Sequence, residues 1–301
     1  ANPIYDTVFK RMMENERVAK FFISTLLEEQ IETVELMPQE FTYSDDFLAI
    51  ALFRLDFIAT IKTQNGEYKK VLIEIQKAKN QIDLMRFRRY LGEQYKKEDN
   101  VNHQKTTLPI TTIYILGFTL PEIESACIKV ERNYRDLINK TIIEKKSAFV
   151  EKLTHDCYIV QVERITDRYQ TSLDKLLSIF EQNYFVDDTK ITKHYNYPTD
   201  IEDLKVITEL LNYAGSNPEQ RKKIEIEQEA WRTVEALFYD QNKELIDKLS
   251  DAEKLVLKKE RDLMEKNKVL EDKDKVLEDK EKENAKLLEE LAELKRKLAN
   301  G

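Results

Sequence analysis

Three polar side chains with the chemistry of a metal site interrupt two apolar runs of the sequence, at Asp56, Glu74 and Gln76. An asparagine followed by a glycine at 65–66 separates the runs, a pair typical of a tight β-hairpin turn because both residues tolerate positive φ. Residues two apart on a strand share a face, so we expect two carboxylates and an amide to converge. A metal ion, a charge partner or a substrate would each explain polar groups in apolar strands.

Paired carboxylates on adjacent strands suit a Mg²⁺ or Mn²⁺ ion, because hard divalent cations prefer oxygen ligands. Such an ion orients an attacking water and neutralises charge that builds up on a phosphodiester. Basic residues surround Glu74 in the sequence, which is the field expected where a polyanion meets a metal; they are Lys69, Lys70, Lys77, Lys79, Arg86, Arg88 and Arg89. The alternative is that these are ordinary solvated charges on strand ends and helix faces.

The elements that must position these residues follow from periodicity and turn signals. An amphipathic helix is expected over 5–29, extended segments over 31–41 and 47–53, the hairpin over 55–77, and a second helix over 80–97. A polar loop over 98–107 precedes a β-branched run over 110–118 that is typical of a buried strand, and two more strands are expected over 127–133 and 157–164. This succession predicts an α/β core with a mixed central sheet.

The chain becomes helical beyond residue 165, with helices expected over 169–185 and 201–214. Gly215 is expected to cap the second of these, ahead of Pro218, and another helix is expected to begin near Glu219. We therefore divide the chain into a core over 1–165, a helical extension over 166–230 and a coiled-coil oligomerisation helix over 231–301.

The last segment follows one heptad frame, with leucines at one position and mostly lysines at the other through its middle. Residues 268–274 and 275–281 are nearly identical tandem heptads. Asn284 occupies the heptad position otherwise held by leucine, where an asparagine can select a two-stranded coiled coil. We expect a homodimer through residues 245–298. The alternative is a single solvated helix stabilised by acidic–basic pairs.

Composition excludes several classes of function. The net charge of −8 does not suit a basic nucleic-acid coat, and five scattered glycines form no phosphate-binding loop, so no nucleotide cofactor is expected. Cys127 and Cys157 lie in apolar runs as buried thiols, and the three histidines lack zinc-ligand spacing. Neither a signal-peptide core nor a membrane-spanning run is present in the sequence, which favours a cytoplasmic protein.

Four short strings of the sequence, in order and spacing, resemble a known family. They are Asp6-Thr7-Val8-Phe9-Lys10, Arg54-Leu55-Asp56, Ile73-Glu74-Ile75-Gln76, and Arg86 followed by Tyr90 and Tyr95. Together they resemble the PD-(D/E)XK nuclease superfamily, and within it the recombination-promoting nuclease/putative transposase family. The likeness covers roughly the first two thirds of the chain.

The resemblance implies a restriction-endonuclease-like core and metal-dependent cleavage of DNA. By this likeness Asp56 and Glu74 hold the metal, the carbonyl of Ile75 completes its shell, and Gln76 positions the water or the phosphate. Gln76 stands where the superfamily's commonest pattern has lysine, so a neutral amide replaces a charge, although this family's own pattern has an amide there.

Other residues have supporting roles in the resemblance. Asp6 approaches the metal from the first helix, and contacts with substrate are implied for Lys10, Lys77, Arg86 and Tyr90. The alternative function is a catalytically inactive nuclease-fold protein that acts as a DNA-binding or assembly module through its coiled coil.

Overall fold

The computed structural model describes residues 1–37, 57–77 and 81–233 and isolated positions beyond them, without the side chains of 81–83 and 86. The chain divides into two compact units, Ala1–Ala230 and Trp231–Gly301. Several sequence predictions lie outside the described residues: the strand over 47–53, the placement of Asp56, Lys79 and the Arg86 side chain, and the coiled-coil seam. The architecture below is that of the first unit.

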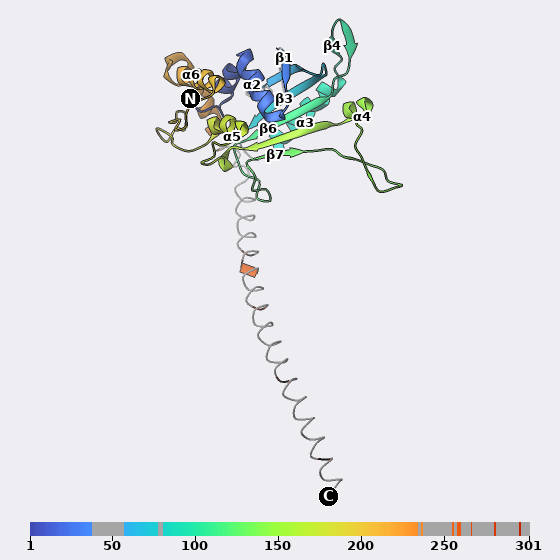
Figure 1. Cartoon of the computed structure of the whole chain (residues 1–301). Coiled ribbons are helices and arrows are strands. Elements are labelled where there is room, and N and C mark those ends of the chain that lie inside the picture. The colour runs from blue at the N-terminus through green and yellow to red at the C-terminus, as the bar shows by residue number, and fades with distance from the viewer. Residues whose placement is uncertain are drawn as a thin grey trace. The chain divides into compact units, whose positions relative to one another are not determined.

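A mixed six-stranded sheet forms the centre of this unit, with the strands in the order β1-β2-β3-β6-β10-β7 (Figure 1). Strand β3 runs parallel to β6, and β6 runs parallel to β10, whereas the other neighbours are antiparallel. The strands span Ile31–Leu36 (β1), Phe57–Thr63 (β2), Tyr68–Gln76 (β3), Ile110–Leu116 (β6), Cys127–Val130 (β7) and His155–Gln161 (β10). The prediction of an α/β core with a mixed sheet is confirmed.

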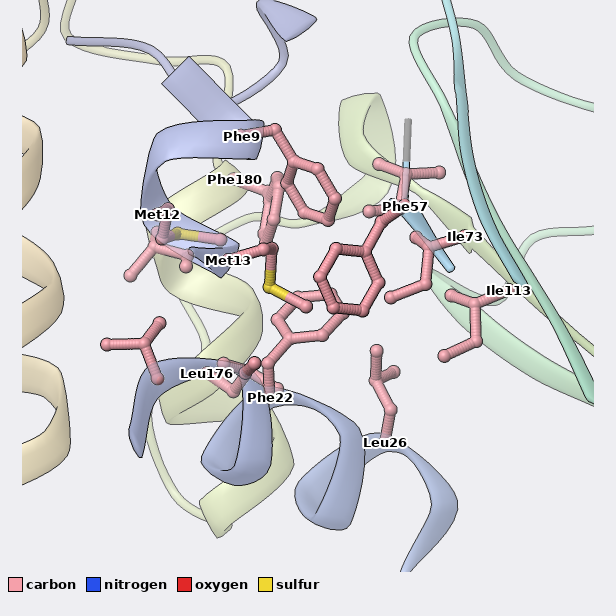
Figure 2. Packing of buried hydrophobic residues seen from close by; sticks show 14 of the residues in the cluster. Phe9, Met12, Met13, Phe22, Leu26, Phe57, Ile73, Ile113, Leu176 and Phe180 are labelled. Carbon is pink, nitrogen blue, oxygen red and sulfur yellow. The ribbon is translucent and has the colours of Figure 1, made fainter. Parts of the chain in front are cut away.

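Helices cover both faces of the sheet. The larger apolar core lies on the face shared with α1 (Asp6–Met13), α2 (Glu16–Leu27), α5 (Ser172–Leu177) and α6 (Glu202–Ser216). Figure 2 shows aromatic rings from these helices packed against the strands: Phe9 and Phe22 lie edge to face at 5.7 Å, beside Phe57 and Ile73. On the other face, Phe87 of α3 (Gln81–Lys96) packs on a smaller cluster with Leu72. Alternate residues of β3 therefore belong to different cores.

The predicted first helix is two helices, since α1 ends at Met13 and α2 begins at Glu16. Asn15 separates them, and its side-chain oxygen accepts the backbone N–H of Val18 at 3.2 Å. An asparagine in this capping position satisfies one of the N–H groups left open by a helix start, so the chain starts a new helix instead of extending the first. The apolar periodicity continues through the break, which is why it predicts one helix.

The β2–β3 hairpin forms at the predicted turn with a different loop geometry. Thr63 and Glu67 close the loop through a backbone hydrogen bond of 2.9 Å, and Gly66 has φ 82°. The positive φ is therefore at the glycine of the Asn-Gly pair, which fits a three-residue loop better than a two-residue one. Pairing of Phe57 with Ile73 sets the register of the two strands.

Short elements complete the unit. The predicted polar loop over 98–107 contains a hairpin of β4 (Asp99–Val101) and β5 (Gln104–Thr106); a second hairpin, β8 (Tyr134–Arg135) and β9 (Ile142–Ile143), precedes α4 (Ala148–Leu153). The 3₁₀ turns Val162–Arg164 and Ser178–Phe180 end β10 and α5, so both elements are shorter than predicted.

The predicted cap at Gly215 is wrong, because α6 continues through Gly215 to Ser216. Asn217 instead begins the next helix, 218–233, and its side chain accepts the N–H groups of Glu219 and Gln220 at 3.0 Å each. Pro218 is the first residue of that helix, where its lack of an N–H has no cost. Asparagine is favoured at the N-cap and proline at the first helical position, so these two residues start a new helix directly after α6.

Candidate metal and nucleic-acid site

Glu74 and Gln76 lie two residues apart on β3 and share one face of the sheet. Leu72 has the same strand parity and packs with Phe87, so this is the face that α3 covers. Both polar side chains are buried, at 2% exposure for Glu74 and 8% for Gln76. They pair with Tyr114 and Leu116 of β6 across the parallel ladder. The predicted convergence of a carboxylate and an amide on one face is therefore present.

Two tyrosines approach the carboxylate of Glu74. Burial raises the pKa of Tyr90 well above its usual value, and the nearby negative charge of Glu74 raises it further. Burial also raises the pKa of Tyr114, with smaller contributions from Cys157 and Glu74. Both phenols thus keep their hydrogens at neutral pH. Both phenols therefore remain potential hydrogen-bond donors in the neighbourhood of Glu74.

Gln94 supports Tyr90 from one turn further along α3. Its side-chain Nε2 donates to the Tyr90 hydroxyl at 3.0 Å, and the residue is 2% exposed. Because the tyrosine oxygen accepts this bond, its own hydrogen is left to point toward another acceptor. Sequence reasoning missed Gln94, although its spacing of four residues from Tyr90 places the two on one helical face.

Asp6 and Lys77 meet a residue that sequence reasoning also missed, Glu227. The Lys77 ammonium forms an ion pair with the Glu227 carboxylate and lies 3.9 Å from the Asp6 carboxylate. Glu227 accepts the backbone N–H groups of Asp6 at 2.9 Å and Thr7 at 3.0 Å. The Lys77 ammonium also lies 4.6 Å from the centre of the Tyr5 ring. We call Tyr5, Asp6, Thr7, Lys77 and Glu227 the Lys77 cluster.

The electrostatics of the Lys77 cluster favour an ionised Glu227. Burial alone would raise the pKa of this carboxyl group, but the charge and hydrogen bond of Lys77 and the N–H groups of Thr7 and Asp6 lower it overall. The Glu227 carboxylate also lies at the N-terminus of α1, where the helix dipole is positive. No local pattern identifies Glu227, since it lies 150 residues from Lys77 in the sequence.

The structure locates some of the other predicted site residues. Lys10 lies half-buried on α1. The Ile75 side chain lies in the large core, so its backbone carbonyl is the group of this residue that could bind a metal. Asp56 and the side chain of Arg86 lie outside the described part of the chain. Asp56 directly precedes Phe57 in the sequence, and Phe57 pairs with Ile73, the residue before Glu74.

Several lysines of the predicted basic rim are neutralised by carboxylates. Lys69 pairs with Glu29 at 2.7 Å, and Lys77 pairs with Glu227. Lys70 and Asp99 form an almost fully buried ion pair at 2.6 Å that anchors the β4–β5 hairpin to β3. Arg88 and Arg89 are exposed on α3. The positive field near Glu74 is therefore weaker than the count of basic residues predicts.

Metal-ligating and redox groups elsewhere are few in the described residues. These residues do not include Asp56, and they contain no cluster of three or more His, Cys, Asp or Glu side chains that could hold an ion. Cys127 and Cys157 are partly buried free thiols, and burial raises the pKa of both. His155 Nδ1 lies 3.0 Å from the Tyr95 hydroxyl, a structural contact.

The described ranges contain no helix that is long and apolar enough to cross a membrane.

Comparison with protein-family models, with curated proteins and with solved structures finds no match to this chain.

Proposed function

We propose that this protein is a metal-dependent nuclease that cleaves DNA. The observation that supports the proposal best is the burial of Glu74 and Gln76 on one face of the central strand β3, beneath α3. Asp56 completes the set, because it precedes Phe57 in the sequence and Phe57 pairs with the residue before Glu74. The order of these residues is the one that resembles the recombination-promoting nuclease family.

The donor chemistry fits a hard divalent cation such as Mg²⁺ or Mn²⁺. Asp56 and Glu74 would contribute carboxylate oxygens and Ile75 its backbone carbonyl, and carboxylate and carbonyl oxygens are the ligands that these ions prefer. When bound, the ion supplies Lewis acidity and compensates negative charge on the phosphate.

The chain's own residues orient the substrate around these carboxylates. The Gln76 amide can donate to a phosphate oxygen or accept from a water, but it cannot take up a proton as lysine does. The Tyr90 hydroxyl keeps its hydrogen, since burial and Glu74 raise its pKa, and it is held in place by Gln94. Tyr90 therefore serves as a hydrogen-bond donor, and Gln94 serves as a positioning residue.

Lys77 and Asp6 have a supporting role in this proposal. Their contacts with Glu227 fix the start of α1 against the end of β3, directly after Gln76. The residues 245–298 pair two chains, so that two catalytic units act on one duplex; this part of the proposal rests on the heptad pattern alone.

A second candidate is a non-catalytic DNA-binding or assembly protein that retains the fold. Neutralisation of Lys69, Lys70 and Lys77 by carboxylates favours it, because substrate phosphates then meet fewer unpaired cations near Glu74. The two candidates differ in whether phosphodiester bonds are broken.

A cleavage assay decides between them. Supercoiled, linear, single-stranded and branched DNA are incubated with the full chain and Mg²⁺ or Mn²⁺, and Asp56→Asn and Glu74→Gln are compared with wild type. We expect each substitution to lower the rate by about 100-fold or more, since each removes a metal ligand. Glu67→Gln is the matched control, because Glu67 is an exposed carboxylate on the same hairpin. Absence of cleavage in every substrate, or equal rates for wild type and Glu74→Gln, would contradict the nuclease proposal.

A further inference from the structure

A slender arm extends from the edge of the sheet. We define it as residues 131–147, which connect edge strand β7 to α4 and include the β8–β9 hairpin (Figure 1). The arm has a two-residue pairing, Tyr134 with Ile143 and Arg135 with Ile142. Its far end carries Leu137 and Ile138, which are 73% and 90% exposed. Covering two adjacent aliphatic side chains of this exposure would be favourable, because apolar surface would leave water, and this favours a binding role.

Hydrogen bonds define the tip of the arm. The Asp136 carboxylate accepts the backbone N–H groups of Ile138 at 2.8 Å and Asn139 at 3.1 Å, and the Asn139 side chain donates to it at 2.7 Å. The N–H of Asp136 also bonds to the carbonyl of Thr141 across the turn. Leu137 and Ile138 are therefore presented by a closed, hydrogen-bonded loop.

The base of the arm is equally well anchored. The Arg132 guanidinium contacts Asp156 at 2.9 Å, Glu151 at 2.7 Å and the Thr154 hydroxyl. The Lys146 ammonium donates to the carbonyl of Arg132 and lies 4.8 Å from the centre of the Tyr134 ring. These contacts connect both strands of the arm to the start of β10. An arm fixed at both ends loses little conformational entropy when it binds.

The charge of the arm differs in sign from that of the whole chain. The arm contains five cations, Arg132, Arg135, Lys140, Lys145 and Lys146, against the three carboxylates Glu131, Asp136 and Glu144. Asp136 is occupied by the N–H groups of the tip. The chain as a whole has a net charge of −8. A locally basic arm on an acidic protein complements a polyanion.

We propose that the arm binds duplex DNA, with Leu137 and Ile138 wedged between base pairs from the minor groove and the neighbouring cations on the flanking phosphates. Aliphatic side chains inserted at a base step unstack it, and the basic residues alongside hold the backbone. A narrow tip of two side chains suits one base step. A second copy of this chain would bind better through a broad face with few charges in its centre.

The arm and the candidate metal site lie at different levels along the parallel strands. Glu74 pairs with Tyr114 of β6, whereas Asp156, which Arg132 contacts at the base of the arm, pairs with Thr111 of β6. These two positions on β6 are three residues apart, which is about 10 Å along the strand. Binding by the arm does not need the metal, and it can be measured apart from cleavage.

The test uses duplexes that contain 2-aminopurine, whose fluorescence rises when its base step is unstacked, in EDTA so that no cleavage occurs. We expect wild type to bind and to raise the fluorescence. Leu137→Ser/Ile138→Ser should abolish the rise and weaken binding about tenfold. Arg135→Gln and Lys140→Gln should each lower the slope of log affinity against log salt by about 1. Val186→Ser is the control, since Val186 is an exposed aliphatic side chain outside the arm.

Three outcomes would overturn the proposal: no DNA binding by wild type, equal fluorescence and affinity for wild type and the tip variant, or unchanged DNA binding with a tip variant that sediments as a smaller species. The last result would identify the arm as a contact between copies. The variant Glu74→Gln changes the candidate metal site and leaves the arm intact. It should therefore affect cleavage and not DNA binding by the arm. Normal arm binding without cleavage by wild type in Mg²⁺ would contradict only the nuclease.

Discussion

Glu227 forms an ion pair with Lys77 and so ties the helix over 218–233 to the end of β3. The carboxylate also takes the place of a side-chain cap for α1, since Tyr5, at the capping position, makes no such bond and Glu227 accepts the N–H groups of Asp6 and Thr7. One side chain thus connects the first helix, the central strand and the last described helix. The geometry around Gln76 depends on it.

Replacing Glu227 by glutamine should destabilise the fold by about 3 kcal/mol, because the nearly buried Lys77 loses its counter-charge. The double variant Lys77→Met/Glu227→Gln should be more stable than Glu227→Gln, since the uncompensated ammonium is then absent while the glutamine oxygen still accepts an N–H group of α1. Urea unfolding checks both expectations through the transition midpoints. A double variant that loses the sum of the two single effects would contradict the ion-pair explanation.

The same carboxylate predicts part of the acid sensitivity. The pKa of Glu227 is lowered in the folded protein, although burial opposes the shift, because Lys77 and the N–H groups of α1 favour the ionised form. Its stabilisation is therefore complete above the ordinary glutamate pKa, near 4.3, and is lost as the pH falls through the lower folded value. Glu227→Gln should flatten the fall in stability below about pH 4.5 relative to wild type. Parallel acid-unfolding curves for the two proteins would contradict this assignment.

Gly117 and Gly92 provide a matched pair of substitutions. A Cβ at Gly117 would lie 2.9 Å from Ile4 Cδ1 and 3.1 Å from both the Cα and the carbonyl oxygen of Lys77, whereas one at Gly92 in α3 would meet nothing within 4 Å. Gly117→Ala should cost about 1–3 kcal/mol, because backbone atoms of Lys77 cannot move aside cheaply. Gly92→Ala should stabilise by about 0.5–1 kcal/mol through helix propensity. Thermal melts of both variants check the opposite signs, and equal shifts would contradict the packing argument.

Local patterns predicted the parts of the fold that local physics controls. The hairpin, helix α3 and strand β6 follow from an Asn-Gly turn, helical spacing and a β-branched run, and each is present. The paired carboxylate and amide at Glu74 and Gln76 follow from strand alternation. Where two local signals competed, as at Asn15 and at Gly215, capping by asparagine prevailed over the longer pattern.

Long-range pairing could not be predicted in this way. The ion-pair partners of Lys77, Lys70 and Lys69 are Glu227, Asp99 and Glu29, respectively. Only the tertiary fold brings these carboxylates near the lysines. A count of basic residues along the sequence therefore overestimated the positive field at the site. The exposure of Leu137 and Ile138 was missed for the converse reason, because a sequence pattern does not reveal which apolar residues remain outside the core.

Gln94 provides a test of how the Tyr90 hydroxyl is positioned, provided that the protein cleaves DNA. Gln94→Leu removes the Nε2 donor that lies 3.0 Å from the Tyr90 hydroxyl and leaves a side chain of similar size in the buried position. We expect kcat to fall about 10-fold to 100-fold, as loss of a supporting hydrogen bond does, while KM for DNA changes little. Glu93→Gln, at an exposed neighbour on α3, is the control and should leave both constants unchanged.

A structural defect would be recognised by urea unfolding, because it would lower stability and activity together. Tyr90→Phe separates the two roles: if Gln94 acts through the Tyr90 hydroxyl, Gln94→Leu should reduce kcat little further in the Tyr90→Phe background. Full additivity of the two substitutions would show that Gln94 acts by another route.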